Sequence, residues 1–173
     1  RNMVGITLDS QGNIYVTQHS APRIRRISTA GIVTTIAGQG GSGYADGAVG
    51  SAKINTPSGI AVDRAGAIYF TDSANHRVRK IANGQMSTLA GGSGGYTDST
   101  GAFARLNYPW GLLLLPSGRL LVTDSNNHRL REVWDSADNC AIGGKCYKKT
   151  FGPKTSECEE CQPAKNAKGW TPR

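Results

Sequence analysis

The stretch TDSANHRVRK at Thr71–Lys80 recurs almost unchanged as TDSNNHRLRE at Thr123–Glu132. Both copies lie inside a longer alignment of three segments. These begin VGITLDSQGNIYVTQHSAPRIRRI at Val4, SGIAVDRAGAIYFTDSANHRVRKI at Ser58 and WGLLLLPSGRLLVTDSNNHRLREV at Trp110. Self-similarity at a spacing of about 50 residues is the signature of a repeat architecture. The phrase is therefore part of a repeating unit.

Each unit has the pattern of four short strands, except that the third lacks a clear fourth strand like VTTIAG or MSTLAG. In the second unit, the runs GIAVD, AIYFTD, RVRKI and MSTLAG are separated by short turns that contain Gly or Asn. Four antiparallel strands in about 40–50 residues are typical of a propeller blade. Helical repeats would need apolar residues at helical spacing, which these units lack. The sequence therefore predicts an all-β propeller of four-stranded antiparallel blades.

The pattern P-x-G-I-A-V-D, followed by G-x-I-Y-x-T-D-S-x-N-H-R-V-R-K-I and a Gly-rich linker, resembles the NHL repeat of β-propellers. The resemblance covers roughly residues 1–134 and implies three blades, at about 1–54, 55–106 and 107–136. The first unit departs from the pattern, because Gln18 replaces the Asp and APR replaces NHR. NHL propellers are mostly binding platforms and typically have six blades, so three blades leave the ring incomplete. We expect the missing blades upstream of Arg1; assembly with other chains, as a two-chain ring or a fibre, is the alternative.

The repeated phrase combines side chains that are common in active sites. Its recurrence with the repeat period nevertheless favours a structural role, because a catalytic constellation normally occurs once. We expect the Asp at the end of the second strand to accept hydrogen bonds from the following turn and from the Arg of the third strand. The predicted blade-building network comprises Asp72, Asn75, His76, Arg77, Asp124, Asn127, His128 and Arg129.

The three histidines, His19, His76 and His128, suggest an alternative. The peptide-amidating lyases are NHL propellers with a zinc site in the central channel, and the resemblance to them implies a zinc-dependent, lyase-like enzyme. However, His76 and His128 occupy equivalent repeat positions while His19 aligns with Ser73, so the spacing does not indicate a shared metal. HExxH, GxSxG and P-loop motifs are absent from the sequence. We predict a non-enzymatic protein without catalytic residues, metal or cofactor.

The Gly-rich linkers contain GSGYADG and GGYTDST, with Asp46 and Asp98 at matching places. We interpret these carboxylates as turn residues of the connections between blades, with Tyr44 and Tyr96 packing over them.

The net charge of +8 favours acidic partners. The strands RIRRI, RVRKI and RLREV predict a basic face similar to that of RNA-binding NHL proteins, so an RNA or acidic-ligand scaffold is a further alternative. Its residues would be Arg25, Arg26, Arg79, Lys80 and Arg131. Charged strands also protect sheet edges from aggregation, and aromatic residues that would stack bases are not interleaved with the arginines. Nucleic acid is therefore not the favoured partner.

All four cysteines, Cys140, Cys146, Cys158 and Cys161, lie in the C-terminal segment, with the spacing C-x5-C-x11-C-x2-C. The C-x2-C pair is compatible with a zinc knuckle. The segment also resembles the Cys-rich, growth-factor-receptor-like modules of extracellular proteins, which implies disulfides at 137–173 in one of three pairings. We therefore expect a small disulfide-stapled module and an extracellular or cell-surface location.

Taken together, the sequence predicts a non-enzymatic extracellular structural or binding protein. Its partners would be other proteins, further copies of the chain in a surface, matrix or filament structure, or an acidic glycan. The sequence has no apolar run that approaches the roughly 18 residues of a membrane span.

Overall fold

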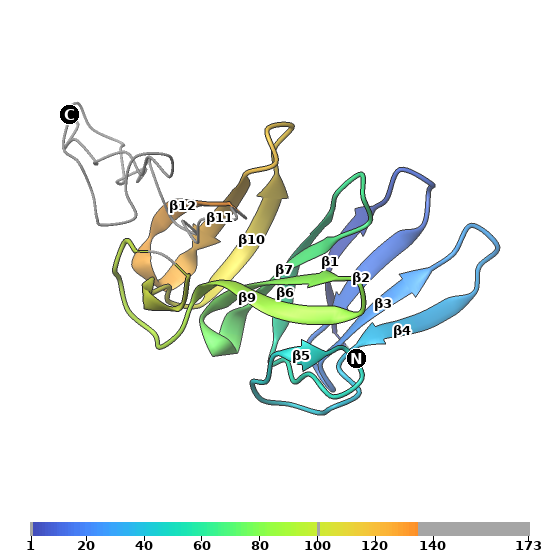
Figure 1. The fold of residues 1–173 in the computed structure, drawn as a ribbon, viewed down its shortest axis with the longest axis horizontal. Helices are drawn as coiled ribbons and strands as arrows, with labels where there is room; N and C mark the ends of the chain where they lie inside the picture. Colours follow the sequence, from blue (N-terminus) through green and yellow to red (C-terminus); the bar gives the residue numbers. More distant parts are fainter. Residues whose placement is uncertain (1, 100, 135–173) are drawn as a thin grey trace.

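The computed structural model describes residues 2–99 and 101–134. These residues form three antiparallel sheets that stand side by side like the blades of a fan (Figure 1). The all-β expectation is confirmed, since the only helical pieces among the described residues are three short 3-10 turns. These turns are η1 (Ser73–Asn75), η2 (Gly101–Phe103) and η3 (Ser125–Asn127).

Apart from the short strand β5, the strands follow one another in chain order across each sheet. The first sheet consists of β1 (Met3–Leu8), β2 (Ile14–Gln18), β3 (Arg23–Ile27) and β4 (Val33–Ala37). The second consists of β6 (Pro57–Val62), β7 (Ile68–Asp72), β8 (Arg77–Ala82) and β9 (Gln85–Gly91), with β5 (Gly47–Ala48) added beside β9. The third consists of β10 (Pro109–Leu114), β11 (Leu120–Asp124) and β12 (Arg129–Val133).

Within the described residues, the three blades do not close into a ring. The short strand β5 belongs to the connection after the first blade but pairs with the second sheet, so this connection wraps the blade that follows it. The four cysteines and the expected module at 137–173 lie outside the described residues. The described part of the chain contains no helix that is long and apolar enough to cross a membrane.

The second sheet is covered on both faces. Successive side chains of a strand point to opposite faces, so Phe70 packs toward the first sheet while Tyr69 packs toward the third. The buried cluster between the first and second sheets comprises Tyr15, Ile24, Ala37, Ala52, Ile54, Ile60, Ile68, Phe70, Ile81 and Met86. The cluster between the second and third sheets comprises Ala67, Tyr69, Val78, Leu89, Ala90, Ala104, Leu106, Leu120, Val122 and Val133.

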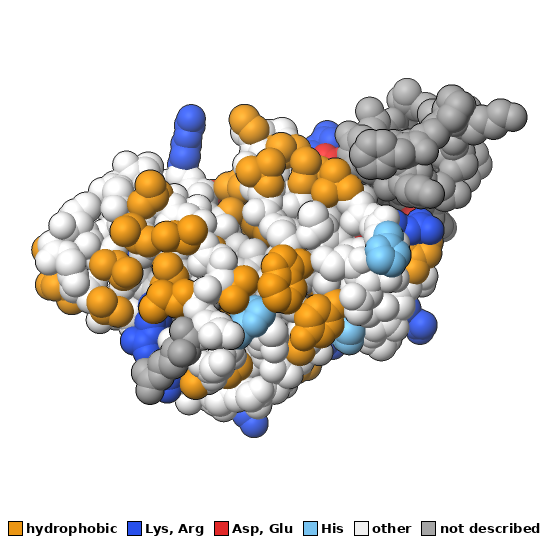
Figure 2. Space-filling model, turned by 180° about the vertical axis from the view of Figure 1, so that it is seen from behind, with side chains coloured by type: hydrophobic (Ala, Val, Ile, Leu, Met, Phe, Trp, Pro, Cys, Tyr) orange, Lys and Arg blue, Asp and Glu red, His pale blue; other side chains and the backbone are white. Residues whose placement is uncertain are grey.

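The outer faces of the first and third sheets carry similar apolar side chains but no covering blade among the described residues. Ile6 is 71% exposed, whereas Ile60, at the same place in the second sheet, is 5% exposed. Leu113 is 57% exposed, whereas its counterpart Ala61 is 7% exposed. Figure 2 shows apolar side chains gathered over the first sheet. We call these two surfaces, which include Ile6, Leu8 and Val33 on the first sheet and Leu113 and Leu130 on the third, the open faces.

A repeated hydrogen-bonded contact joins each blade to the next. In the second blade, the hydroxyl of Thr71 accepts the N–H of Gly59 at 2.8 Å and donates to the carbonyl of Trp110 in the third blade at 2.7 Å. In the first blade, Thr17 links Gly5 and the carbonyl of Ser58 in the same way, at 2.8 and 2.6 Å. We call this contact the inter-blade clip.

The clip explains the glycines that anchor the repeat. Each inner strand has an irregularity of register at its glycine, as in a β-bulge. A Cβ on Gly5 would lie 2.0 Å from the carbonyl oxygen of Ser58, and one on Gly59 would lie 2.6 Å from that of Trp110. Only glycine allows the next blade to approach this closely.

In the third blade the clip is half made. The hydroxyl of Thr123 accepts the N–H of Gly111 at 2.7 Å, but no described residue accepts its proton. At the other end of the fan, the carbonyl of Val4 corresponds to the acceptor carbonyls of Ser58 and Trp110, and no described threonine donates to it. The open faces therefore hold the two complementary halves of one clip.

Replacing Thr71 by valine should lower the free energy of unfolding by about 1–3 kcal/mol, because the N–H of Gly59 and the carbonyl of Trp110 would lose their partner at a blade junction. Chemical denaturation measures the change. Thr123→Val is the matched control and should cost clearly less, since Thr123 is exposed and makes only the bond within its own blade. Equal losses in the two variants would contradict the account of the clip.

Candidate functional site

An extensive polar site of the described residues lies where a linker wraps the blade that follows it. Arg79 on β8 is fully buried, and its guanidinium binds two carboxylates at once. One nitrogen lies 2.6 Å from a carboxylate oxygen of Asp72, at the end of β7. Another lies 2.7 Å from Asp46, in the linker before the blade. The same guanidinium donates to the linker carbonyls of Ala45 and Lys53 at 2.8 and 3.2 Å.

The remaining side chains of the repeated phrase complete this arrangement. Asp72 accepts the backbone N–H of Asn55 at 2.7 Å and the side-chain amide of Asn75 at 2.9 Å. Asn75 also donates to the carbonyl of Gly43 in the linker at 2.8 Å. The guanidinium of Arg77 lies 3.7 Å from the centre of the Tyr44 ring, a distance typical of a cation–π contact. We call the set Tyr44, Asp46, Asp72, Asn75, Arg77 and Arg79 the linker clamp.

The third blade has a second clamp with the same geometry. Arg131 binds Asp124 at 3.0 Å and also binds Asp98 in the preceding linker. Asn127 donates to Asp124 and to the carbonyl of Gly95, both at 2.8 Å. Arg129 lies 3.6 Å from the centre of the Tyr96 ring. The clamp therefore recurs with the repeat and fixes a linker to its blade.

Two features of the clamp differ from the sequence interpretation. The arginine that pairs with Asp72 is Arg79, two residues beyond the predicted Arg77, because Arg77 stacks on Tyr44 instead. Asp46 and Asp98 are ion-pair partners rather than simple turn residues. The recurrence of Tyr-x-Asp at the same 52-residue spacing as Arg79 and Arg131 was the signal that could have revealed them.

The predicted basic face requires a correction. Arg79 and Arg131 are buried and paired with carboxylates, so they present no free charge to a ligand. The prediction also combined residues from opposite sides of a strand, because Arg25 and Arg79 share one side while Arg26 and Lys80 lie on the other. Arg25, Arg26 and Lys80 are each only partly exposed.

The first blade has an incomplete clamp. Gln18 stands in place of Asp72, and its amide donates to the carbonyls of Ser20 and Ala21 at 2.6 and 3.1 Å. Arg25, which corresponds to Arg79, makes no ion pair with a carboxylate of the described residues, whereas Arg79 and Arg131 each make two. This blade therefore keeps the cation of the clamp while the described chain supplies neither carboxylate.

The three histidines occupy separate places. His19 lies 3.0 Å from the Ser58 hydroxyl and contacts the edge of Trp110, with 5.1 Å between ring centres. His76 accepts the backbone N–H of Tyr108 at its Nδ1, and the side chain of His128 is exposed. Burial lowers the pKa of His19, which favours its neutral form. Within the part of the chain that the structure describes, no group of three or more His, Cys, Asp or Glu is arranged to hold a metal ion.

Arg79→Met should lower the free energy of unfolding by about 3–5 kcal/mol, because the buried carboxylate of Asp72 would lose its counter-ion. Burial already raises the pKa of Asp72, despite hydrogen bonds from Asn75, Asn55 and Arg79. The remaining hydrogen bonds would therefore not offset the cost of burying this carboxylate without Arg79. Arg25→Met is the matched control and should cost no more than about 1 kcal/mol. Urea denaturation distinguishes the two. A loss for Arg25→Met as large as that for Arg79→Met would refute the assignment of the clamp.

The family model of the NHL repeat matches residues 55–81 and 106–132, which correspond to the second and third blades. The chain is 36% identical over 91 residues to the chloroplastic protein SUPPRESSOR OF QUENCHING 1 of Arabidopsis thaliana, with 51% of this chain and 9% of that protein covered. It is 33% identical over 102 residues to NHL repeat-containing protein 2 of Gallus gallus, with 51% and 13% covered. The chain spans about a tenth of the length of these curated relatives.

Solved structures resemble the fold of the described blades. An auxiliary nutrient binding protein from Bacteroides thetaiotaomicron aligns with a TM-score of 0.61 at 24% identity, over 73% of this chain and 36% of that chain. A chain of a nidogen/laminin complex aligns with a TM-score of 0.56 at 24% identity, over 82% and 51%. Virginiamycin B lyase from Staphylococcus aureus aligns with a TM-score of 0.54 at 17% identity, over 82% and 44%.

At these identities the solved structures establish the fold alone, and they include an enzyme as well as binding proteins. The chain contains two NHL repeats, and its described residues form a segment of a β-propeller.

Proposed function

We propose that this chain is a non-enzymatic binding scaffold whose open faces bind further propeller blades of the same type. The observation that carries the proposal is the complementarity of the two faces. The open face of the first sheet is equivalent to the side of the second sheet that packs against the first. The open face of the third sheet is equivalent to the side of the second sheet that packs against the third. Each open face is therefore suited to bind a blade of the type that the chain already contains.

The two halves of the inter-blade clip set the register of this docking. The hydroxyl of Thr123 would donate to the carbonyl of the residue directly before the anchoring glycine of an incoming blade, as Thr71 donates to the carbonyl of Trp110. The carbonyl of Val4 would accept from the corresponding threonine of a blade on the other side, as Ser58 accepts from Thr17. Apolar burial supplies most of the binding free energy, and the clip supplies the alignment.

In a solution of this chain alone, the only available blades belong to another copy. Three blades from each of two copies would fall within the usual four to eight blades of a closed propeller. The contact is heterologous, since one copy uses its first blade and the other its third, so a ring forms if the rotation closes and a filament forms if it does not. A two-copy ring is the smallest closed product.

We propose further that the scaffold binds other proteins outside the cell. The similarity to a chain of a nidogen/laminin complex is compatible with a role of such a fold in protein binding. The four cysteines of the C-terminal segment support an extracellular location for this scaffold.

Light scattering of the 173-residue chain, over a range of concentrations and without reductant, tests the proposal. We expect a mass that rises with concentration to two copies or more. Ile6→Lys should return the chain to a single copy, because a buried unpaired charge at a blade junction is costly. Ile32→Lys is the control, since Ile32 is 66% exposed in the β3–β4 turn. A folded wild type that stays a monomer, or equal effects of the two lysines, would refute self-association.

A further inference from the structure

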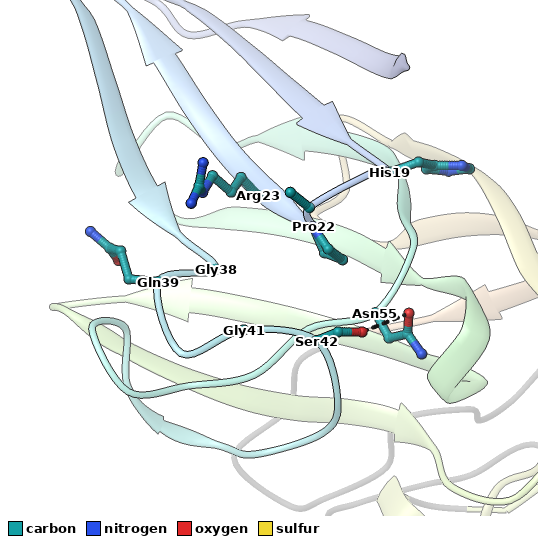
Figure 3. A pocket seen from close by; sticks show the side chains of 9 residues that line it. His19, Pro22, Arg23, Gly38, Gln39, Gly41, Ser42 and Asn55 are labelled. Atoms are coloured by element: carbon teal, nitrogen blue, oxygen red, sulfur yellow. Dashed lines mark hydrogen bonds between the residues drawn. The ribbon is translucent and has the colours of Figure 1, made fainter. Parts of the chain in front are cut away.

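The first blade has the two arginines of the linker clamp but no described linker over them. Arg23 stands at the place of Arg77, and Arg25 stands at the place of Arg79, in the same register against the second strand of the blade. Arg79 is fully buried, whereas Arg25 is half-buried. Among the described residues, no carboxylate pairs with Arg25 and no aromatic ring stacks on Arg23. Figure 3 shows the Arg23 guanidinium clear of every other labelled side chain.

The outer edge of the first blade is also uncovered. In the second blade, β5 pairs with β9, and Gly47 lies opposite Met86. β4 is the counterpart of β9, but it is the last strand of its sheet, with no described strand beyond it. Val33 stands at the place of Met86 and is exposed, whereas Met86 is buried. An open edge of this kind can accept an extended segment as an additional strand.

The second blade shows which segment fits such a site. Its linker has the sequence YADG at Tyr44–Gly47. The tyrosine ring of this linker stacks on Arg77. The carboxylate of Asp46 binds Arg79 at 2.7 Å and accepts the backbone N–H of Thr88 at 3.2 Å. The linker of the third blade supplies the same pair of side chains, so an aromatic ring two residues before an acid is the common element.

The first blade depends on an outside carboxylate more than the other two blades do. In the complete clamps the blade itself supplies one carboxylate, from Asp72 or Asp124. Gln18 stands at that place in the first blade, and a neutral amide does not balance the charge of Arg25. The site therefore has two cations and, among the described residues, no anion. Hydrogen bonds between a guanidinium and a carboxylate are among the strong ones in proteins, so the site favours an acidic ligand.

We propose that this edge of the first blade binds an extended segment of a partner protein that contains Tyr-x-Asp followed by a small residue. The segment lies antiparallel to β4, as β5 lies along β9. Its ring stacks on Arg23, and its carboxylate binds Arg25 and the N–H of Thr35, which stands at the place of Thr88. Binding of this segment does not require a blade on the open face, because it uses only the edge of β4 and the two arginines.

The partner is a different protein rather than a further copy of this chain. The sequence contains Tyr-x-Asp at only two places, Tyr44–Asp46 and Tyr96–Asp98. Both are already held in the clamps of the second and third blades. A copy that supplied either segment would have to empty its own clamp, so the exchange would bring no net gain in contacts.

The test uses the whole chain and the fluorescein-labelled peptide GSGYADGAV, which copies residues 41–49, with binding followed by fluorescence anisotropy. Saturable binding is expected. The same peptide with Asn in place of its Asp should bind at least tenfold more weakly, because it loses a hydrogen bond between two charged groups. A peptide with Ala in place of its Tyr should also bind more weakly. No saturable binding, or equal binding of the Asp and Asn peptides, would overturn the proposal.

Two variants locate the bound peptide. Arg25→Met should weaken binding of GSGYADGAV at least tenfold. Arg26→Met is the matched control and should keep the wild-type affinity, because this side chain points to the other side of the same strand. Hydrogen exchange of the wild type provides a readout without any mutation, since the amide of Thr35 should become protected when the peptide binds. Equal effects of the two variants, or an unchanged Thr35 amide, would contradict the assignment.

Ile6→Lys distinguishes this site from the docking of blades. The folded variant should keep the affinity for GSGYADGAV although it no longer self-associates. Peptide binding by a wild type that stays a monomer would likewise support the site while refuting self-association. Loss of peptide binding in a folded Ile6→Lys chain would show that the segment binds only as part of a contact between blades, which would overturn an independent site.

Discussion

The contact between one blade and the next is the constraint on which the rest of this structure depends. A four-stranded sheet with apolar side chains on both faces cannot cover both faces by itself, so each blade needs two neighbours. The second blade has them, and its core residues are buried on both sides. The contact is aligned by a threonine hydroxyl that bridges the bulge of its own inner strand and a carbonyl of the next blade. The glycine at the bulge is required because the neighbouring backbone lies where a Cβ would be.

The linker clamp holds each linker to the blade that follows it. A linker rich in glycine has little apolar surface with which to hold itself to the blade. A buried guanidinium overcomes this by binding one carboxylate from the blade, a second from the linker, and linker carbonyls between them. We expect such a buried network to contribute more to a single defined linker path than to net stability, because the cost of removing the charges from water offsets much of their attraction. The first blade, which has the arginine but neither carboxylate, also lies outside the residues matched by the NHL model.

Periodicity predicted the strands and their antiparallel order, because these follow from local alternation and from recurrence along the chain. It did not identify the partner of Asp72, since Arg77 and Arg79 are both basic and only the side to which each points distinguishes them. The predicted basic face failed for a related reason: the sequence gives charges but not the buried carboxylates that neutralise them.

The central claim is that the open faces are the two halves of one interface. Hydroxyl-radical footprinting at low and high protein concentration tests it directly, because oxidation reports the exposure of individual side chains. The account predicts that Ile6 and Leu8 on the first sheet and Leu113 and Leu130 on the third become protected together as concentration rises, while Ile32 stays reactive. Unchanged reactivity of both faces, or protection of Ile32 to the same extent, would contradict it.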